Sequence, residues 1–277
     1  MLQTDKIDKI IKIALEEDIS SYDITTENVF KNSDYSIATI IAKEDGILAG
    51  IEVFKRVFYI LDNKIEFKQY YDDGDTIKDG NLIIELSGST INLLKGERTA
   101  LNLLQRLCGI ATLTNKYCRK VKDYNVKVTD TRKTTPGLRH IEKYAVKVGG
   151  GANHRYNLSD GVLIKDNHIK ACNGIKNAVE KIRGNIPHTI KIEVETENLD
   201  DVKEAIEAKA DIIMLDNMKY EEMSKAVELI KKSVLIEASG NVDFDNIENY
   251  AKTGVDIISV GKLTHSFKSM DISMKIK

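Results

Sequence analysis

Apolar runs of strand length recur at a regular spacing in the second half of this 277-residue chain, and most of them end in a polar residue or glycine. The steps between the residues that close four successive runs are 21, 23 and 22 residues, counted along Glu195, Asp216, Ser239 and Gly261. A step of this size accommodates one strand and one helix, and strands that are apolar throughout are typical of a parallel sheet covered by helices. The spacing therefore predicts repeated βα units.

Six apolar runs are clear candidates for these strands, and a seventh candidate is AVKVGGG at residues 145–151. The six are VKVTDT (126–131), VLIKDN (162–167), TIKIEVE (189–195), DIIMLD (211–216), VLIEASG (234–240) and DIISVG (256–261). Helical patterns such as LDDVKEAIEAKA and MKYEEMSKAVELIKKS lie between the later runs. We therefore predict an incomplete (β/α) barrel of about seven strands, which is an α/β fold.

The first part of the chain has a different pattern. Residues 5–17 have the apolar spacing of an amphipathic helix, and residues 35–54 and 73–94 alternate β-branched residues with glycine and aspartate turns, as short antiparallel strands do. A long helix is predicted from about residue 91. The prediction is a smaller N-terminal α+β domain at 1–105 and a barrel at 106–265, with the C-terminal tail 266–277 as a candidate to pack on the smaller domain.

The charge balance argues against a nucleic-acid or membrane partner, because 41 basic and 43 acidic residues with a pI near 6.3 create no general positive field. The N-terminus lacks the apolar core of a signal peptide, and no run approaches the length of a membrane span, so a cytoplasmic protein is expected. Cys108, Cys118 and Cys172 are odd in number and lack CxxC spacing, which predicts reduced thiols.

In (β/α) barrels the active site forms at the C-terminal ends of the strands. In this sequence those ends carry Asp130, Lys165, Glu195, Asp216, Ser239 and Gly261. The position in the predicted fold is thus sufficient to select candidate site residues.

Cationic residues gather beside two of these strand ends, at Arg132, Lys133, Arg139 and Arg155. Each of them alone could be a solvated loop charge. Together they favour a substrate with several anionic groups, because planar guanidinium groups bind carboxylate and phosphate oxygens in pairs. The glycines of KVGGGANHR allow close backbone approach to a ligand, although the same stretch could be a flexible loop.

Several roles stay open for the strand-end residues. Lys165 could form a Schiff base, as in an aldolase, or act as a point charge for phosphate. Glu195 and Asp216 could hold magnesium carried by a phosphorylated substrate, or form ion pairs with nearby lysines. The glycine turns in EASGN and SVGKLTH could bind a phosphate through backbone N–H groups.

The histidines are poor candidates for a metal site. His154, His168 and His265 do not share a HExxH or similar ligand spacing, so hydrogen bonding is the expected role.

The motifs ERTALNLLQRLCGIAT, DTRKTTPGLRHIEKYAVKVGGGANHRYNLSDGVLIKDNHI, IEVE, IIMLDN, EASG and SVGKLTHS resemble the quinolinate phosphoribosyltransferase family, in order along nearly the whole chain. DITT and AKEDGILAG extend the resemblance to the first part. The sequence departs from the family pattern at Tyr22, where glycine is common, at Cys108, where serine is common, and at Asn241, where a second glycine often follows SG.

The resemblance implies transfer of phosphoribosyl from phosphoribosyl pyrophosphate to quinolinate, with decarboxylation to nicotinate mononucleotide, carbon dioxide and pyrophosphate, a step of NAD biosynthesis. Magnesium is the expected cofactor, and no organic cofactor is needed. The matched motifs assign quinolinate binding to Arg98, Arg132, His154, Arg155 and Lys165. They assign phosphoribosyl pyrophosphate binding to Lys133, Glu195, Asp216, Ser239, Gly240, Gly261 and His265. Lys133, Lys165, Glu195 and Asp216 are the expected catalytic residues, and Glu195 and Asp216 the expected metal ligands.

Arg98 precedes the barrel strands, and the resemblance implies that it enters the pocket of a neighbouring subunit. A homodimer with a shared active site, or a higher oligomer, is therefore expected. Three alternatives remain at this point: a related phosphoribosyltransferase-like protein of molybdenum metabolism with another acceptor, a Schiff-base aldolase that uses Lys165, and a non-catalytic phosphate-binding module.

Overall fold

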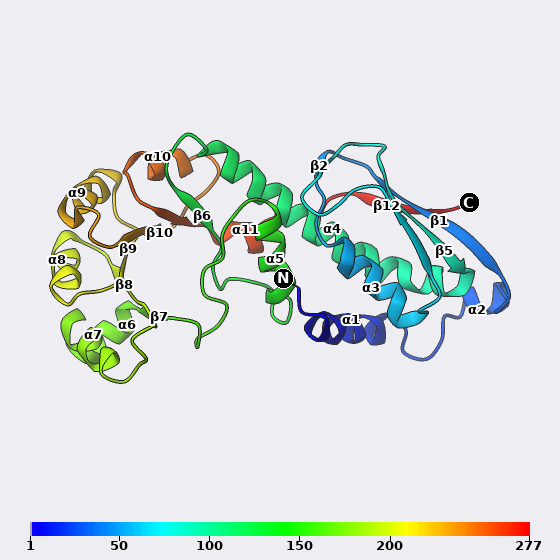
Figure 1. The fold of residues 1–277 in the computed structure, drawn as a ribbon, viewed down its shortest axis with the longest axis horizontal. Coiled ribbons are helices and arrows are strands. Elements are labelled where there is room, and N and C mark those ends of the chain that lie inside the picture. The colour runs from blue at the N-terminus through cyan, green and yellow to red at the C-terminus, as the bar shows by residue number, and fades with distance from the viewer. Residues whose placement is uncertain (1) are drawn as a thin grey trace. The chain divides into compact units, whose positions relative to one another are not determined.

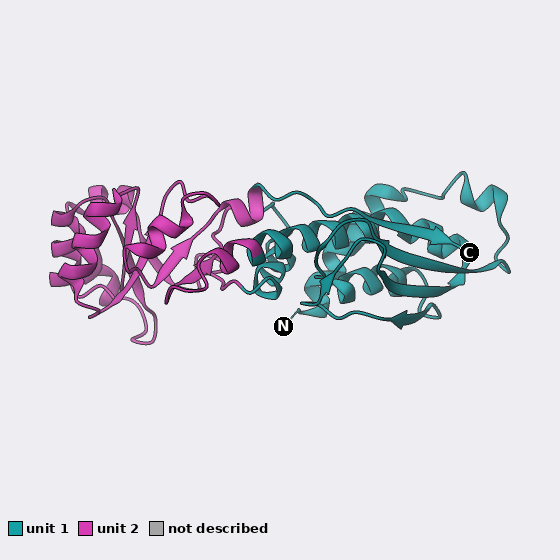
Figure 2. Cartoon of the chain, turned by 90° about the horizontal axis from the view of Figure 1, so that it is seen from above, with its two compact units in different colours: residues 1–115, 134–150, 266–277 teal, residues 116–133, 151–265 magenta. Residues whose placement is uncertain are grey.

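The computed structural model describes residues 2–277, which form two compact units (Figure 2). Unit 1 comprises residues 1–115, 134–150 and 266–277, and unit 2 comprises residues 116–133 and 151–265. Unit 1 is therefore built from three separate segments of the chain, and unit 2 from two. No helix within residues 2–277 combines the length and the apolar character needed to cross a bilayer.

Unit 2 contains a six-stranded parallel sheet in the order β6-β11-β10-β9-β8-β7. Its strands are β6 (Lys127–Thr129), β7 (Val162–Ile164), β8 (Ile192–Thr196), β9 (Ile212–Asp216), β10 (Leu235–Ser239) and β11 (Ile257–Ser259). All six clear strand predictions are thus confirmed. Because β6 and β7 both lie at edges of this order, the sheet is an incomplete (β/α) barrel.

Helices follow the strands along the chain, and most of them lie outside the curved sheet in Figure 1. They are α6 (Asp166–Cys172), α7 (Ile175–Arg183), α8 (Leu199–Glu207), α9 (Tyr220–Ile230), α10 (Ile247–Lys252) and α11 (Lys262–His265). In α8 the side chain of Asn198 accepts hydrogen bonds from the N–H groups of Asp200 and Asp201, which satisfies two donors at the start of the helix. The buried centres of the strands and the buried residues of α7, α8, α9 and α10 form the core of the unit.

The predicted seventh strand, AVKVGGG, is wrong. Residues 145–148 end helix α5 (Arg139–Val148), in which Ile141, Ala145 and Val146 are buried. Their spacing of four and five residues places them on one side of a helix, so the short alternation in AVKV is part of a longer helical pattern. Between β6 and β7, a single parallel bridge joins Ala152 to Thr129 of the sheet.

Unit 1 combines an antiparallel sheet with helices. The four-stranded sheet has the order β12-β1-β5-β3, and a second sheet pairs β2 with β4. The strands are β1 (Tyr35–Ala42), β2 (Gly46–Ile47), β3 (Glu66–Gln69), β4 (Thr76–Ile77), β5 (Leu82–Ser89) and β12 (Ile272–Ile276). The C-terminal strand β12 pairs with β1, with Ala38 opposite Ile276.

The helices of unit 1 include two that the sequence pattern predicted. These are α1 (Thr4–Asp18) and α4 (Thr90–Lys120), whose last residues belong to unit 2. The others are α2 (Thr26–Val29), α3 (Ile51–Leu61) and α5. The strand reading of residues 51–54 is wrong, because this segment opens α3 and buries Val53 and Phe54 together with Val57 and Phe58. Buried residues with that spacing lie on one face of a helix.

Candidate active site

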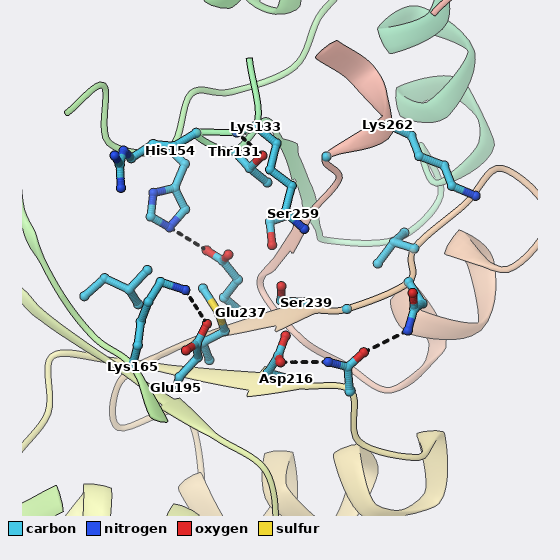
Figure 3. A pocket seen from close by; sticks show the side chains of 18 of the residues that line it. Thr131, Lys133, His154, Lys165, Glu195, Asp216, Glu237, Ser239, Ser259 and Lys262 are labelled. Carbon is cyan, nitrogen blue, oxygen red and sulfur yellow. Dashed lines mark hydrogen bonds and ion pairs between the residues drawn. The ribbon is translucent and has the colours of Figure 1, made fainter. Parts of the chain in front are cut away.

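A pocket of about 780 Å³ opens at the C-terminal ends of the parallel strands, and all of its lining residues belong to unit 2 (Figure 3). Side chains two residues apart on a strand point to the same face of the sheet, and this alternation selects the lining of the pocket. The strand-borne lining residues are Leu163 and Lys165, Glu195, Met214 and Asp216, Glu237 and Ser239, and Ser259 and Gly261.

The loop after β6 brings Arg132 and Lys133 to the pocket, and the segment after α5 brings His154 and Arg155. The fully buried carboxylate of Asp130 links these two segments. Its Oδ1 accepts a hydrogen bond from the backbone N–H of His154 at 2.9 Å, and its Oδ2 accepts one from the Asn153 amide at 2.7 Å. Asp130 therefore fixes the loop that carries two of the candidate site residues.

Arg155 is partly buried and lies close enough to Arg132 for the two positive charges to repel each other. Burial, and then the charge of Arg132, lower the pKa of Arg155 below its ordinary value. One of its terminal nitrogens donates to the carbonyl oxygen of Gly161 at 2.9 Å, whereas its buried Nε has no hydrogen-bond partner. An anion bound between the two guanidinium groups would relieve this repulsion.

Lys165 and Glu195 form an ion pair within the pocket. The Lys165 Nζ lies 2.8 Å from Glu195 Oε1, and the two side chains are 45% and 15% exposed. Lys165 directly follows β7, and Glu195 lies near the end of the neighbouring strand β8. The ion pair between Glu195 and a lysine, one of the roles left open by the sequence, is thus present, and both residues also line the pocket.

His154 lies against two buried glutamates, Glu193 and Glu237. Its Nε2 is 3.2 Å from a carboxylate oxygen of Glu193 and 3.8 Å from one of Glu237, and its Nδ1 accepts a hydrogen bond from the backbone N–H of Arg155 at 2.7 Å. Burial and the neighbouring charge of Glu193 raise the pKa of Glu237, which favours its protonated form. By donor type, the three side chains could also hold a cation.

Glu193 and Glu237 are not among the site residues predicted from the sequence. Both lie inside strands that otherwise read as apolar, and both are almost fully buried. A glutamate within an apolar strand is itself a signal, because a buried carboxyl group needs a partner or a proton. This signal lies in IEVE and IEAS, within the strands and not at their ends.

The ends of β9 and β10 bring Asp216 and Ser239 side by side, since these residues are paired in the register of the sheet. The following residues, Asn217 and the pair Gly240 and Asn241, also line the pocket. Gly240 has a φ of 97°, and a Cβ atom there would overlap the side chain of Asn217. Glycine is therefore required at this position by both conformation and space.

The last strand end contributes Gly261 and His265, with Lys133 beside them. A Cβ atom on Gly261 would lie 3.0 Å from His265 Nε2 and 3.2 Å from the Lys133 side chain. The hydroxyl group of Thr264 donates to the carbonyl oxygen of Lys133 at 2.8 Å, which ties the loop after β6 to α11. Residues from these two segments thus lie together on one side of the pocket.

Three cationic or histidine candidates lie outside this lining. Arg98 is an exposed residue of α4 in unit 1. Arg139 lies at the start of α5, where its Nε donates to the hydroxyl oxygen of Thr134 at 2.9 Å. His168 lies in the first turn of α6 and accepts a hydrogen bond from the backbone N–H of Lys165 at 3.0 Å. The strand-end candidate Asp130 is fully buried behind the lining, and the other predicted site residues line the pocket.

The sequence matches two protein-family models that together span nearly the whole chain. Residues 23–108 match the quinolinate phosphoribosyl transferase N-terminal domain, and residues 110–275 match the C-terminal domain of the same family. The chain belongs to the quinolinate phosphoribosyl transferase family. The resemblance of the sequence motifs is thereby confirmed.

Curated relatives support this membership over their full length. A probable nicotinate-nucleotide pyrophosphorylase [carboxylating] of Bacillus subtilis is 44% identical over 98% of this chain and 93% of its own. The protein of the same description from Methanocaldococcus jannaschii is 46% identical over 97% of this chain and 96% of its own. Neither relative carries a description from molybdenum metabolism or from the aldolases.

A solved structure supports the fold. The crystal structure of NadC from Streptococcus pyogenes matches with a TM-score of 0.97 and 45% sequence identity, covering 100% of this chain and 98% of that one. This chain therefore shares the incomplete α/β barrel with a separate, smaller N-terminal domain with that structure.

Proposed function

We propose that this chain is a carboxylating nicotinate-nucleotide pyrophosphorylase, which transfers phosphoribosyl from phosphoribosyl pyrophosphate to quinolinate as a step of NAD biosynthesis. The observation that carries the proposal is one pocket, at the mouth of the barrel, that is lined by both cations and carboxylates. A substrate pair with two carboxylates, a pyrophosphate and a 5'-phosphate needs such an arrangement. The descriptions of the full-length relatives support the same reaction.

Quinolinate would bind at the side of the pocket that carries His154 in Figure 3. Arg132 and Arg155 would bind its two carboxylates, since planar guanidinium groups match carboxylate oxygens. The depressed pKa of Arg155 supports this role, because it reports burial beside a second cation, a setting that an anion stabilises. His154 would contribute its ring, and Lys165 its charge, to the same subsite.

The 5'-phosphate would bind beside Ser239, Gly240, Gly261 and His265. The two glycines support this assignment. A Cβ atom at either position would lie against neighbouring side chains, and without a side chain the backbone of each glycine can approach a ligand closely. Lys133 would reach the pyrophosphate from the facing loop, and Asp216 and Glu195 would lie near the ribose hydroxyl groups.

The transfer step needs no covalent attachment to the protein. The ring nitrogen of quinolinate forms a bond to the ribose C1 as the bond from C1 to the pyrophosphate oxygen breaks, and pyrophosphate leaves with the electron pair. Glu195 and Asp216 would stabilise the positive charge that develops on the ribose, and Lys133 and Lys165 the negative charge on the leaving group. Lys165 is held for this role by its ion pair with Glu195.

Decarboxylation follows from the product of the transfer. The bond from C2 to its carboxylate breaks, carbon dioxide leaves, and the electron pair stays on C2 beside the positively charged ring nitrogen until a solvent proton adds there. The guanidinium groups would hold the ring in place during this step.

Magnesium suits the donor set at two adjacent strand ends, since Glu195 and Asp216 offer the hard carboxylate oxygens that this ion prefers. Glu195 and Asp216 would hold the magnesium ion, and the ion would neutralise part of the negative charge of the pyrophosphate. One oxygen of each carboxylate already accepts a hydrogen bond, that of Glu195 from Lys165 and that of Asp216 from Asn217.

We also propose a homodimer in which Arg98 of one copy completes the quinolinate subsite of the other. Arg98 is exposed on α4 of unit 1 and does not line the pocket of unit 2, so a second copy is the simplest source of its positive charge at that site.

The direct experiment is product analysis. Purified protein with quinolinate, phosphoribosyl pyrophosphate and magnesium should release equal amounts of carbon dioxide, pyrophosphate and nicotinate mononucleotide. Nicotinate in place of quinolinate is the control, because it lacks the carboxylate that leaves. Turnover of nicotinate but not of quinolinate would contradict the proposal.

A further inference from the structure

Two asparagines beside the pocket both adopt a backbone conformation that few side chains tolerate. Asn217 follows β9 with a φ of 54°, and Asn241 follows the turn at Gly240 with a φ of 51°. Asparagine is among the few residues other than glycine that populate this left-handed region. The departure from the family pattern at Asn241 therefore preserves the backbone geometry that glycine would allow and adds a side chain.

That side chain takes part in a chain of hydrogen bonds across the pocket rim. The Asn241 Nδ2 donates to the Oδ1 of Asn217 at 3.0 Å, and the Asn217 Nδ2 donates to the Oδ2 of Asp216 at 2.7 Å. Figure 3 draws both bonds as dashed lines beside Asp216. We call these two asparagines, Asn217 and Asn241, the asparagine bridge.

The direction of these bonds is fixed by the charge of Asp216. An ionised carboxylate only accepts hydrogen bonds, so Asn217 must present its NH₂ group to Asp216. Its carbonyl oxygen then faces Asn241, which must also present its NH₂ group. Replacement of Asn241 by aspartate would place an acceptor against an acceptor, although the two side chains have nearly the same shape.

The backbone around the asparagine bridge is also held in place. The N–H of Asn217 donates to the carbonyl oxygen of Ser239 at 3.0 Å, which joins the ends of β9 and β10. The Tyr250 hydroxyl donates to the carbonyl oxygen of Gly240 at 2.7 Å, and the Asn246 amide donates to that of Asn241 at 3.0 Å. Movement of the turn after β10 would therefore disturb the position of Asp216.

We infer that the asparagine bridge positions Asp216 relative to the turn at Gly240, so that the site selects a ligand carrying both a ribose 2-hydroxyl group and a 5-phosphate. The inference rests on the proposed function, in which Asp216 binds ribose hydroxyls and the turn binds the phosphate. Asn217 and Asn241 are positioning residues, because they act through Asp216 and the turn.

The test compares the binding of ribose 5-phosphate and 2-deoxyribose 5-phosphate by calorimetry. Wild-type protein should prefer the ribose ligand. In Asn241→Gly, which keeps the backbone conformation but removes the amide, that preference should fall by about threefold to tenfold, as expected for loss of one hydrogen bond. Asn241→Asp should lower it at least as much.

Asn173 provides the matched control. It is an exposed asparagine in the same unit, with a φ of 56° at the end of α6, and it does not line the pocket. Asn173→Gly and Asn173→Asp should leave the preference unchanged, and thermal melting should show that all four variants are folded. The readout is a ratio of two affinities, so a general loss of stability does not produce the expected result.

Two outcomes separate the inference from the proposed function. An unchanged preference in both Asn241 variants, with wild-type protein preferring ribose 5-phosphate, would overturn the positioning role alone. In the second outcome, wild-type protein turns over quinolinate fully but does not bind ribose 5-phosphate. This result would also overturn the positioning role, while the proposed function would stand on the product analysis.

Discussion

The Nζ atom of Lys165 lies 2.8 Å from Oε1 of Glu195, across two neighbouring strands of the barrel. This ion pair bears on both functions that the sequence left open for Lys165. A lysine that forms a Schiff base must act as a nucleophilic amine, whereas a lysine paired with a carboxylate is suited to act as a fixed positive charge. The geometry therefore favours the second function.

Substitution of Lys165 separates these functions. We expect Lys165→Ala to reduce kcat by on the order of a hundredfold, the upper end for loss of a charge-assisted hydrogen bond, and Lys165→Arg to retain part of the activity because it keeps the charge. Borohydride treatment with a carbonyl compound, followed by peptide mass spectrometry, should find no adduct on Lys165. An adduct, together with an inactive Lys165→Arg variant, would support the aldolase function.

The adjacent arginines Arg132 and Arg155 are expected to bind the carboxylates of quinolinate. Replacement of either by lysine keeps the charge but removes the planar pair of donors, so kcat/KM for quinolinate should fall by at least about tenfold. Steady-state kinetics with each substrate varied in turn measure this effect. Arg139→Lys is the control, because Arg139 lies outside the pocket lining. Equal kinetics in all three variants would exclude the assigned role.

The fold of unit 2 was predictable because its strands are continuous apolar runs separated by helical patterns of regular length. The errors fall where a short alternation of β-branched residues belongs to a helix, as in residues 51–54 and 145–148. A short local pattern fits both a strand and a helix. Which of the two forms depends on how the rest of the fold buries the segment. Strand β12 pairs with β1 from the opposite end of the chain, and the bounds of such a strand depend on contacts that are distant in sequence.

The candidate site was predictable to the extent that strand ends determine it. The lining at Lys165, Glu195, Asp216 and Ser239 follows from the C-terminal ends of parallel strands. The asparagine bridge was not predicted, because its hydrogen bonds join residues that only the folded chain brings together. The buried glutamates are marked in the sequence as charged residues inside apolar strands, but their shared partner His154 is evident only in the folded chain.

Asp216 is expected to contribute to the response to magnesium. Asp216→Asn removes the negative charge while nearly preserving shape, so kcat should fall and the magnesium concentration for half-maximal activity should rise. Titration of activity with magnesium, alongside thermal melting, measures both effects. A variant that melts early but keeps full activity per folded molecule would instead indicate a structural role.

The raised pKa of Glu237 predicts a specific dependence of stability on pH. Burial and the charge of Glu193 raise this pKa from its ordinary value of 4.5 to about 8. Between these values the native state keeps a proton that the unfolded chain releases, so this group lowers the free energy of unfolding as the pH rises from about 4.5 towards 8. Below 4.5 both states are protonated and the group has no such effect.

The glutamine in the Glu237→Gln variant cannot release a proton. The free energy of unfolding of this variant should therefore fall less than that of wild-type protein as the pH rises. Urea unfolding at pH values near 5 and near 8 measures the difference, and the variant should gain relative to wild type at the higher value. Glu85→Gln is a control, because Glu85 lies in unit 1 and its pKa is lowered by hydrogen bonds from Lys277 and Tyr70. Parallel stability curves for wild type and Glu237→Gln would contradict the raised pKa.

The proposed sharing of Arg98 between two copies of the chain can be tested by subunit mixing. Arg98→Ala and Lys165→Ala should each be nearly inactive as homodimers. In a heterodimer of these variants with Arg98 acting on the other copy, one pocket would carry both lesions and the other neither. Each heterodimer should then recover about half of the normal activity, by the symmetry of a two-fold dimer.

As a control, Arg132→Ala mixed with Lys165→Ala should not recover, because both residues line the same pocket of one chain and every site keeps a lesion. Subunit exchange is verified by native mass spectrometry, and its occurrence without recovery for the Arg98 pair would mean that Arg98 does not act on the partner copy.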